Sequence, residues 1–258
     1  MNLLNYKVEN RIATVSINRP PANALATELL KELNEVVDKI ENDADVKVVI
    51  LHGEGRFFSA GADIKEFTQV QTIDQGSSMS SYGQRVFERI EGLKKPVIAA
   101  IHGAALGGGL ELAMSCHIRL VAKKTKLGLP ELTLGLIPGF GGTQRLARYV
   151  GYQKAAEMML TSEPITGEEA VRCGLALRCY EVEEQLLEGA KELAEKIANK
   201  SAIAIGYALE SLSYVKDIKF QEGVAKEADL FGRIFMSEDT KEGINAFIEK
   251  RKPNFQDR

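Results

Sequence analysis

The sequence of 258 residues predicts an α/β fold that ends in a helical region. Two apolar runs, VKVVILHG at 46–53 and VIAAIHG at 97–103, each end in histidine and glycine, and loops of small residues follow them. Patterns typical of helices lie between and after these runs. Beyond about residue 182 the apolar residues recur with helical spacing to the end. Strand and helix signals that alternate, followed by helices alone, favour an α/β core with a helical C-terminal part.

The first strand–helix unit begins with residues 11–17 (RIATVSI), a short run rich in β-branched residues that stops at Arg19-Pro20-Pro21. A helix follows, because aliphatic residues then recur at steps of three and four. These are Leu25, Leu29, Leu33, Val36 and Ile40. The run at 46–53 predicts a second strand, and GEGRFFSAGAD after it is too rich in small residues to be regular.

The run at 97–103 repeats this design, with AALGGG and then the helical stretch LELAMSCH. In both units, backbone N–H groups at the mouth of a helix can stay unpaired and point at a ligand. Between the units, residues 69–83 (QVQTIDQGSSMSSYG) are polar and rich in serine. We expect a mobile loop or an irregular helix start there, and such a segment often covers a site.

The rest of the chain is predicted with less detail. Strands are expected at 118–122 and 175–181, helices at 142–150 and 152–161, and a capping box at Thr166 and Glu169. The C-terminal helices show apolar faces at Phe231, Ile234 and Phe235, and at Ile244, Phe247 and Ile248.

Composition limits the classes of partner. Hydrophobic residues make up 45% and charged residues 27% of the chain, which is typical of a globular protein. The net charge is -3 and the basic residues form no stripe, which argues against nucleic acid as a partner. The N-terminus lacks a signal-peptide pattern and no stretch approaches the length of a membrane span, so we expect a cytoplasmic protein without membrane attachment.

Cysteines and histidines predict neither a metal site nor a disulfide framework. The three cysteines form no CxxC pair, and the three histidines never stand at HxxxH spacing. His52 and His102 each end an apolar strand and are interpreted as structural, while His117 lies near a helix end that favours positive charge. No Ser-His-Asp or Cys-His grouping emerges from residue order.

The glycines of both loops allow two interpretations. Gly107-Gly108-Gly109 fits neither the phosphate loop nor GxGxxG, so it is either a tight turn or a place where a ligand meets backbone N–H groups. In the second case, a carbonyl oxygen could accept from Gly108, and the same holds for Gly61-Ala62.

Two glutamates lie in apolar surroundings near these loops. Glu111 follows Gly108 by three residues, so its carboxyl group would lean back over Gly108; the alternative is a solvated face or a carboxylate favoured by the helix N-terminus. Glu131 stands among aliphatic residues after Pro130, where burial would raise its pKa, or it is simply the second residue of a short helix. Two such groups near amide-rich loops favour acid–base chemistry.

Four segments resemble the crotonase (enoyl-CoA hydratase/isomerase) superfamily. They are FSAGADIKEF (58–67), IAAIHGAALGGGLELAMSCHI (98–118), LPE (129–131) and IPGFGGTQRL (137–146). The resemblance implies a crotonase-like spiral of repeated ββα units over 1–181, which holds the active site. It also implies a helical trimerisation region over 182–258 and assembly as homotrimers or homohexamers (dimers of trimers).

The same resemblance implies the site residues. The two oxyanion amides fall on Ala62 and Gly108, and the two catalytic glutamates on Glu111, which activates water, and Glu131, which supplies the α-proton. Contacts to the substrate's coenzyme A fall on Ala60, Asp63, Ile64 and Lys65, and the Gly139 backbone lies near the catalytic water. The substrate is an acyl-CoA thioester, with no metal and no cofactor beyond the coenzyme A that the substrate carries.

With both glutamates present, the resemblance favours an enoyl-CoA hydratase, a hydro-lyase of fatty-acid or related acyl-CoA degradation. Members that only shift a double bond typically keep one acid/base group at a different position. An enoyl-CoA isomerase, a methylglutaconyl-CoA-type hydratase and a non-catalytic acyl-CoA binding subunit are the alternatives. His117 departs from the pattern, since many relatives carry aspartate there, but it lies outside the predicted catalytic positions.

Overall fold

The computed structural model describes residues 2–217 and, further on, residues 238, 239, 242, 246, 249, 251 and 253–258. The apolar faces predicted at Phe231, Ile234 and Phe235, and at Ile244, Phe247 and Ile248, lie outside these described residues.

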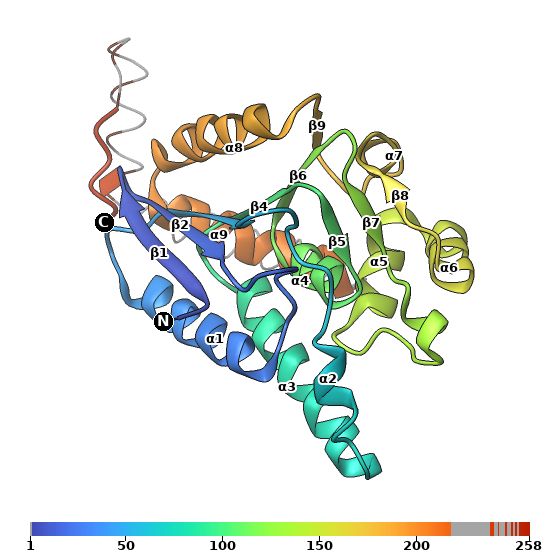
Figure 1. Ribbon diagram of the computed structural model, residues 1–258. Helices are drawn as coiled ribbons and strands as arrows, with labels where there is room; N and C mark the ends of the chain where they lie inside the picture. Colours follow the sequence, from blue (N-terminus) through green and yellow to red (C-terminus); the bar gives the residue numbers. More distant parts are fainter. Residues whose placement is uncertain are drawn as a thin grey trace.

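Six strands form the main sheet in the order β1-β2-β3-β4-β6-β9 (Figure 1). They are β1 (Leu4–Glu9), β2 (Ile12–Ile17), β3 (Val48–Gly53), β4 (Val97–Ile101), β6 (Ile118–Ala122) and β9 (Arg178–Tyr180). β1 runs antiparallel to β2, and every other neighbouring pair in this sheet is parallel. A smaller sheet joins β5 (Ala104–Leu106), β7 (Lys126–Gly128) and β8 (Ile165–Thr166).

The central strands are apolar throughout because both faces of the main sheet are covered. On β3, Val49 and Leu51 belong to the larger core cluster, and Val48 and Ile50 belong to the smaller one. Helices α1 (Thr27–Asn42), α3 (Ile73–Glu91) and α4 (Gly108–Ser115) supply side chains to the larger cluster. Helix α8 (Glu183–Ala198) covers the opposite face with its small and aliphatic residues (Figure 1).

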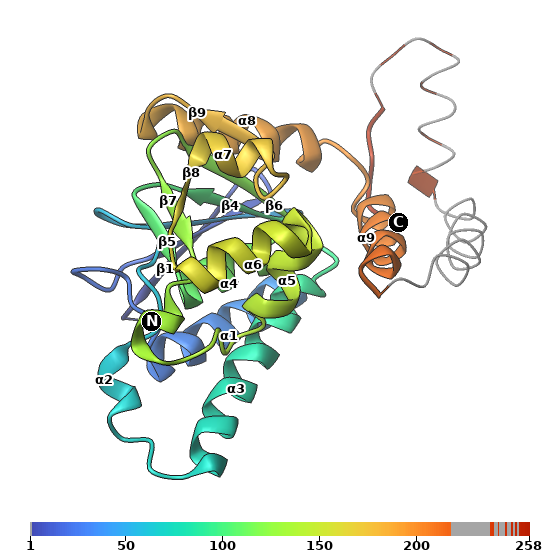
Figure 2. The ribbon, with the colours of Figure 1, turned by 90° about the vertical axis from the view of Figure 1, so that its right-hand side faces the viewer.

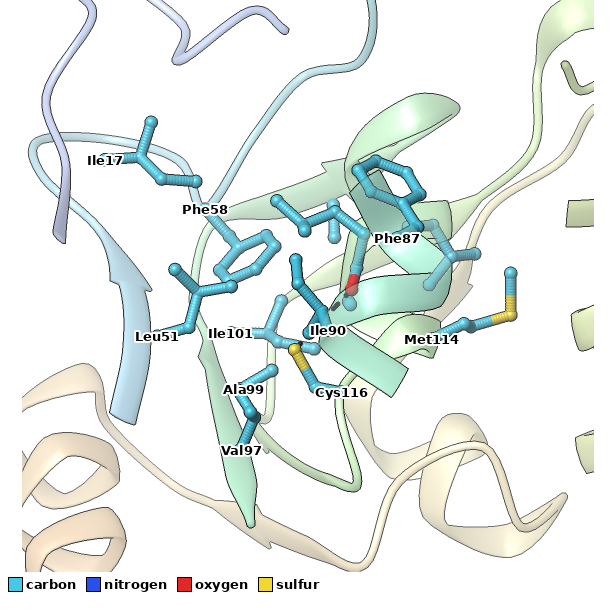
Figure 3. Close-up of a cluster of buried hydrophobic side chains, with 14 of the residues drawn as sticks. Ile17, Leu51, Phe58, Phe87, Ile90, Val97, Ala99, Ile101, Met114 and Cys116 are labelled. Carbon is cyan, nitrogen blue, oxygen red and sulfur yellow. Dashed lines mark hydrogen bonds between the residues drawn. The ribbon is translucent and has the colours of Figure 1, made fainter. Parts of the chain in front are cut away.

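The larger cluster also anchors the loop that follows β3. Phe58 in this loop is fully buried, and Figure 3 shows its ring beside Leu51 and Ile101 of the sheet. The irregular segment predicted after residue 53 is therefore held in place by a large side chain. Because Phe58 is anchored in the core, the residues next to it in sequence are held at a fixed position relative to the sheet.

Most of the predicted elements are confirmed. The strands expected at 11–17, 46–53, 97–103 and 118–122 correspond to β2, β3, β4 and β6, and the two helices correspond to α5 (Gly142–Val150) and α6 (Tyr152–Thr161). The strand expected at 175–181 is shorter, as β9. Thr166 caps α7 (Gly167–Arg172) by accepting a hydrogen bond from the Glu169 N–H at 3.3 Å.

Of the two alternatives predicted for residues 69–83, the helix start is correct, but the helix is regular and covers most of the segment. A regular helix, α3, begins at Ile73, and a capping box between Thr72 and Gln75 starts it. The serines that suggested a loop sit in this helix, where its first turns are largely exposed to solvent. A short helix, α2 (Ile64–Phe67), precedes it, and Asp63 caps α2.

The last described helices follow α8. Helix α9 (Ala202–Ser213) is apolar, yet only Gly206 within it is buried, and the turn η2 (Tyr214–Asp217) continues it. Figure 2 shows α9 at the edge of the described part of the chain. Among the helices that the structure describes, none has both the length and the apolar character needed to cross a bilayer.

Candidate active site

A cavity of about 600 Å³ lies where both strand–loop–helix units meet α3. Its wall comes from the loop after β3, the N-terminal half of α3, the start of α4, and the segment from Pro130 to Phe140 that includes the 3-10 turn η1 (Glu131–Leu134). Most of the lining is apolar, and it includes Phe67, Val70, Met79, Leu136 and Ile137. Such a cavity suits a ligand with an aliphatic part and few polar atoms.

Two backbone N–H groups, those of Ala62 and Gly108, reach this cavity from separate loops. The loop before α2 is pinned beside Ala62, because Leu25 N donates to Gly61 O at 2.8 Å and Asp63 N donates to Leu25 O at 3.1 Å. Gly108 opens α4, and a Cβ added to it would lie 3.4 Å from Ala62 N. Within the described residues neither N–H donates a hydrogen bond. Two convergent free donors suit an oxygen that gains negative charge.

Glycine is required at this turn for physical reasons. Gly107 has φ 50° and ψ −127°, a conformation that side chains with a Cβ rarely adopt. A Cβ on Gly109 would lie 2.3 Å from Ser59 O, so the two loops can approach closely only with glycine there. The tight-turn interpretation of GGG is therefore correct, and the close packing brings the two free N–H groups together; their contact with a ligand stays a prediction.

Glu111 lies on the first turn of α4 and is only 1% exposed. Its Oε1 accepts hydrogen bonds from Phe140 N at 2.8 Å and from Gly142 N at 2.7 Å. Gly142 permits this approach, since a Cβ there would lie 2.8 Å from Oε1. Burial, together with the charge of Glu131, raises the pKa of Glu111 to about 7. The alternative of a solvated face is therefore wrong for this residue.

Glu131 begins η1 directly after Pro130 and is half-buried. Its Oε2 is buried, and among the described residues it has no hydrogen-bond partner. A Cβ on Gly107 would lie 2.9 Å from Oε1, so the carboxyl group sits against the glycine turn. Burial raises the pKa of Glu131 above its ordinary value. The alternative interpretation is correct in placing Glu131 at the start of a short helical turn, but Glu131 is the first residue of η1 and not the second, because Pro130 is the N-cap.

Three of the five residues predicted to bind the substrate or its coenzyme A line the cavity. Ala60, Ile64 and Gly139 line it. Asp63 points elsewhere: it forms an ion pair with Arg19 at 2.5 Å, which holds the pKa of this carboxyl below its usual range. Lys65 is exposed on α2 and is not part of the cavity wall.

Several site residues carry no clear signal in the sequence. Gly76, Met79 and Ser80 of α3 line the cavity, and so does the ring-bearing residue Phe140, whose N–H holds Glu111. The glycines of GFGGT are a usable signal, since they allow backbone N–H groups to meet a partner closely. Which partner they meet depends on tertiary structure.

The histidines bind backbone groups. His52 Nδ1 lies 3.0 Å from Gly53 O, and His102 Nε2 lies 2.9 Å from Gly55 O. His117 Nδ1 accepts a hydrogen bond from Val97 N at 3.1 Å, so the ring acts there as a neutral acceptor and not as the cation expected near a helix end. Over the described part of the chain, no group of three or more histidine, cysteine or acidic side chains could hold a metal ion.

Two glutamates and two free N–H groups in one apolar cavity define a site for acid–base chemistry on a compound whose carbonyl oxygen gains negative charge. The sequence matches the family described as Enoyl-CoA hydratase/isomerase over residues 7–258. The chain belongs to this family.

Two relatives and one solved structure show how close the similarity is. The chain is 53% identical to a probable enoyl-CoA hydratase of Bacillus subtilis, over 99% of each chain. It is 44% identical to a short-chain-enoyl-CoA hydratase of Clostridium acetobutylicum, over 98% of this chain and 97% of that protein. A crystal structure of enoyl-CoA hydratase from Bacillus anthracis superimposes with a TM-score of 0.94 at 37% identity, over 99% of this chain and 100% of that one.

Proposed function

We propose that this protein adds water across the α,β double bond of a short-chain 2-enoyl-CoA to give a 3-hydroxyacyl-CoA, in fatty-acid or related acyl-CoA degradation. One observation carries the proposal: a single apolar cavity holds two carboxyl groups with raised pKa and two unpaired N–H donors from separate loops. The relatives named enoyl-CoA hydratase support it.

The two N–H groups would bind the thioester carbonyl oxygen. When a hydroxyl group adds to the β-carbon, the double-bond electrons move to this oxygen and form an enolate. Ala62 N and Gly108 N are placed before the reaction, so they stabilise the new charge without reorganisation. Removing one donor of this kind typically costs about 10²–10³ in rate.

The glutamates would move the two protons. With a pKa of about 7, Glu111 exchanges between its acid and its carboxylate near neutral pH, so part of the protein holds the carboxylate that can take a proton. Two N–H donors on its Oε1 favour the carboxylate of Glu111, whereas the unpartnered Oε2 favours the neutral form of Glu131. Glu111 then takes a proton from water as the water oxygen attacks the β-carbon. Glu131 gives its proton to the α-carbon, and exchange with solvent restores the starting state.

Substrate recognition follows from the same cavity. Ala60, Ile64 and Gly139 line it and would contact the pantetheine part or the attacking water, with Asp63 at the N-cap of α2 and Lys65 on this helix beside them. We propose no metal and no further cofactor, because the two glutamates and the two N–H groups supply the acid, the base and the charge stabilisation that hydration needs.

We also propose a homotrimer or a homohexamer in the cytoplasm, with residues 182–258 as the oligomerisation region beyond the core of 1–181. Support comes from α9 and η2, where Leu212 is 62% and Val215 is 72% exposed although the segment is apolar. A second copy would cover these side chains. The cysteines Cys116, Cys173 and Cys179 are all free thiols, which suits a reducing compartment.

A spectrophotometric assay with crotonyl-CoA tests the proposal, using protein treated with a chelator and given no nicotinamide cofactor. We expect loss of the enoyl absorbance and 3-hydroxybutyryl-CoA as the product. Conversion of a 3-enoyl-CoA to a 2-enoyl-CoA without hydration would instead support the isomerase, and turnover of methylglutaconyl-CoA alone would support that branched hydratase. If the protein binds acyl-CoA but turns over none of these substrates, the result would support the non-catalytic binding subunit.

A further inference from the structure

One face of α3 contacts the Gly139–Phe140 segment, in which the Phe140 N–H donates a hydrogen bond to Glu111. Ser80, Gly83, Gln84 and Phe87 are spaced as i, i+3, i+4 and i+7, so they form a single stripe along this helix. All four contact the Gly139–Phe140 segment, which lies more than fifty residues further along the chain than each of them. This stripe is therefore the surface of α3 on which the Gly139–Phe140 segment packs.

The polar half of the stripe binds a carbonyl. Ser80 Oγ donates to Gly139 O at 2.5 Å, and Gln84 Nε2 donates to the same oxygen at 2.9 Å. Gln84 Nε2 also lies 3.2 Å from Ser80 Oγ, so the two side chains brace one another. The Gly139 carbonyl is thus held from two directions.

The apolar half of the stripe seats the Phe140 ring. A Cβ on Gly83 would lie 2.4 Å from Phe140 Cδ1, so the ring rests directly on the helix backbone. Phe87 meets the ring edge-to-face, with centroids 5.6 Å apart and planes at 83°. This packing fixes where the segment lies, and the polar contacts fix how its peptide bond is turned.

The carbonyl of Gly139 and the N–H of Phe140 belong to one peptide bond. This bond is planar, so the direction of its C=O determines the direction of its N–H. Phe140 N donates to Glu111 Oε1 at 2.8 Å. A hydrogen bond accepted by the C=O also polarises the unit and strengthens its N–H as a donor.

We propose that Ser80 and Gln84 are positioning residues for Glu111, acting through the Gly139–Phe140 peptide bond. They aim its N–H at the Glu111 carboxyl group, which favours the ionised form and fixes the orientation of the group that would activate water. This inference rests on the proposed hydration and on the role of Glu111 in it.

Other charges also act on Glu111 and must stay constant in the test. Glu131 from η1 raises its pKa, and Arg145 from α5 lowers it. Arg145 is itself paired with Glu91 of α3 at 2.9 Å and donates to Phe140 O. Substitutions at Ser80 and Gln84 leave all three of these residues unchanged.

The experiment measures the pH dependence of crotonyl-CoA hydration in Ser80→Ala, Gln84→Met and the double variant. Either donor alone can hold the carbonyl, so each single variant should lower kcat about threefold and the double variant about 30-fold, with KM within about twofold. A less stabilised carboxylate binds its proton more tightly. The acid limb of the kcat/KM profile should therefore move to higher pH by about half a unit in the double variant.

Ser81→Ala and Gln144→Met serve as matched controls. Gln144 is exposed, and among the described residues its side chain binds only the neighbouring Thr143, while Ser81 is not part of the cavity wall. Both should keep the wild-type profile. A double variant with a lower melting temperature but unchanged kcat and acid limb would reduce the stripe to a packing role and overturn the inference. Glu111→Gln is measured alongside: if it retains turnover, the role proposed for Glu111 is wrong, whatever the stripe does.

Discussion

Glu111 and Glu131 share one cavity but sit in opposite surroundings. Glu111 comes from a buried helix and receives two N–H donors on one oxygen, whereas Glu131 comes from a half-exposed turn and keeps one buried oxygen without a partner among the described residues. Hydrogen bonds favour a carboxylate, and burial without them favours the neutral acid. The two side chains are of the same residue type, so the backbone around them is what distinguishes the roles proposed for them.

The largest expected effect comes from removing either member of the pair. Glu111→Gln and Glu131→Gln should each lower crotonyl-CoA hydration by about 10³–10⁴, because each removes one proton transfer from the same reaction. The double variant should be little slower than either single variant, as for groups that act as a unit.

Steady-state rates should be read together with melting temperatures and the binding of a saturated acyl-CoA, which shows whether the cavity survives. Losses that multiply in the double variant would mean that the two groups act independently. A single variant that melts several degrees lower and keeps near-normal turnover would make that glutamate a structural cap.

A second prediction concerns stability against pH and separates the two glutamates. The folded protein holds the Glu111 proton up to about pH 7, while the unfolded chain releases it near the ordinary value of 4.5. Because the folded state binds more protons in this window, the free energy of unfolding should fall as pH rises from about 4.5 to 7. The full contribution of Glu111 is about 3 kcal/mol.

Chemical denaturation gives the free energy of unfolding of the wild type and of Glu111→Gln at several pH values. The contribution of Glu111 is the change with pH in the difference between these two free energies. The glutamine side chain can still accept from Phe140 N and Gly142 N, so the variant should match the wild type near pH 5 and exceed it near pH 8. The same comparison with Glu131→Gln should show a smaller change, since Glu131 is less buried. A constant difference across this range would contradict the raised pKa of the buried Glu111 carboxyl group.

Much of the fold could be predicted from the sequence, because it depends on local pattern. Runs such as 46–53 and 97–103 are apolar on both faces, and only a covered sheet accommodates them. Segment 69–83 is misleading, since exposed serines hide the period of α3. The start of this helix is still readable, because Thr72 and Gln75 stand at capping-box spacing.

Part of the candidate site could also be predicted from the sequence, and part of it could not. Glycine-rich loops and apolar surroundings mark Ala62, Gly108, Glu111 and Glu131, as does the resemblance to the family. The different surroundings of the two glutamates could not be predicted from the sequence, because the N–H donors of Glu111 lie 29 and 31 residues further along the chain. Nothing in the local sequence of Glu131 shows that its carboxyl group lacks such donors.

The smallest expected effect comes from substituting Gly142, the glycine that lets the Glu111 carboxyl group approach its N–H donors. A Cβ at Gly142 would lie 2.8 Å from Glu111 Oε1 and 3.0 Å from Pro138 Cβ, so Gly142→Ala must displace the carboxylate. No backbone strain arises, because Gly142 is the first residue of α5 and has an ordinary φ. Stability should therefore change by only about 1 kcal/mol, since alanine also favours a helix.

Activity should respond more than stability in this variant. A carboxylate moved by a few tenths of an ångström loses alignment with both N–H groups and with the attacking water, so kcat should fall about 10-fold with KM nearly constant. Gly135→Ala is the matched control: Gly135 ends the turn that carries Glu131, has φ 69°, and a Cβ there meets nothing within 4 Å. It should cost about 1–2 kcal/mol of stability through backbone strain and leave kcat near the wild-type value. If Gly142→Ala instead loses stability and keeps kcat, the close fit around Glu111 serves packing and not catalysis.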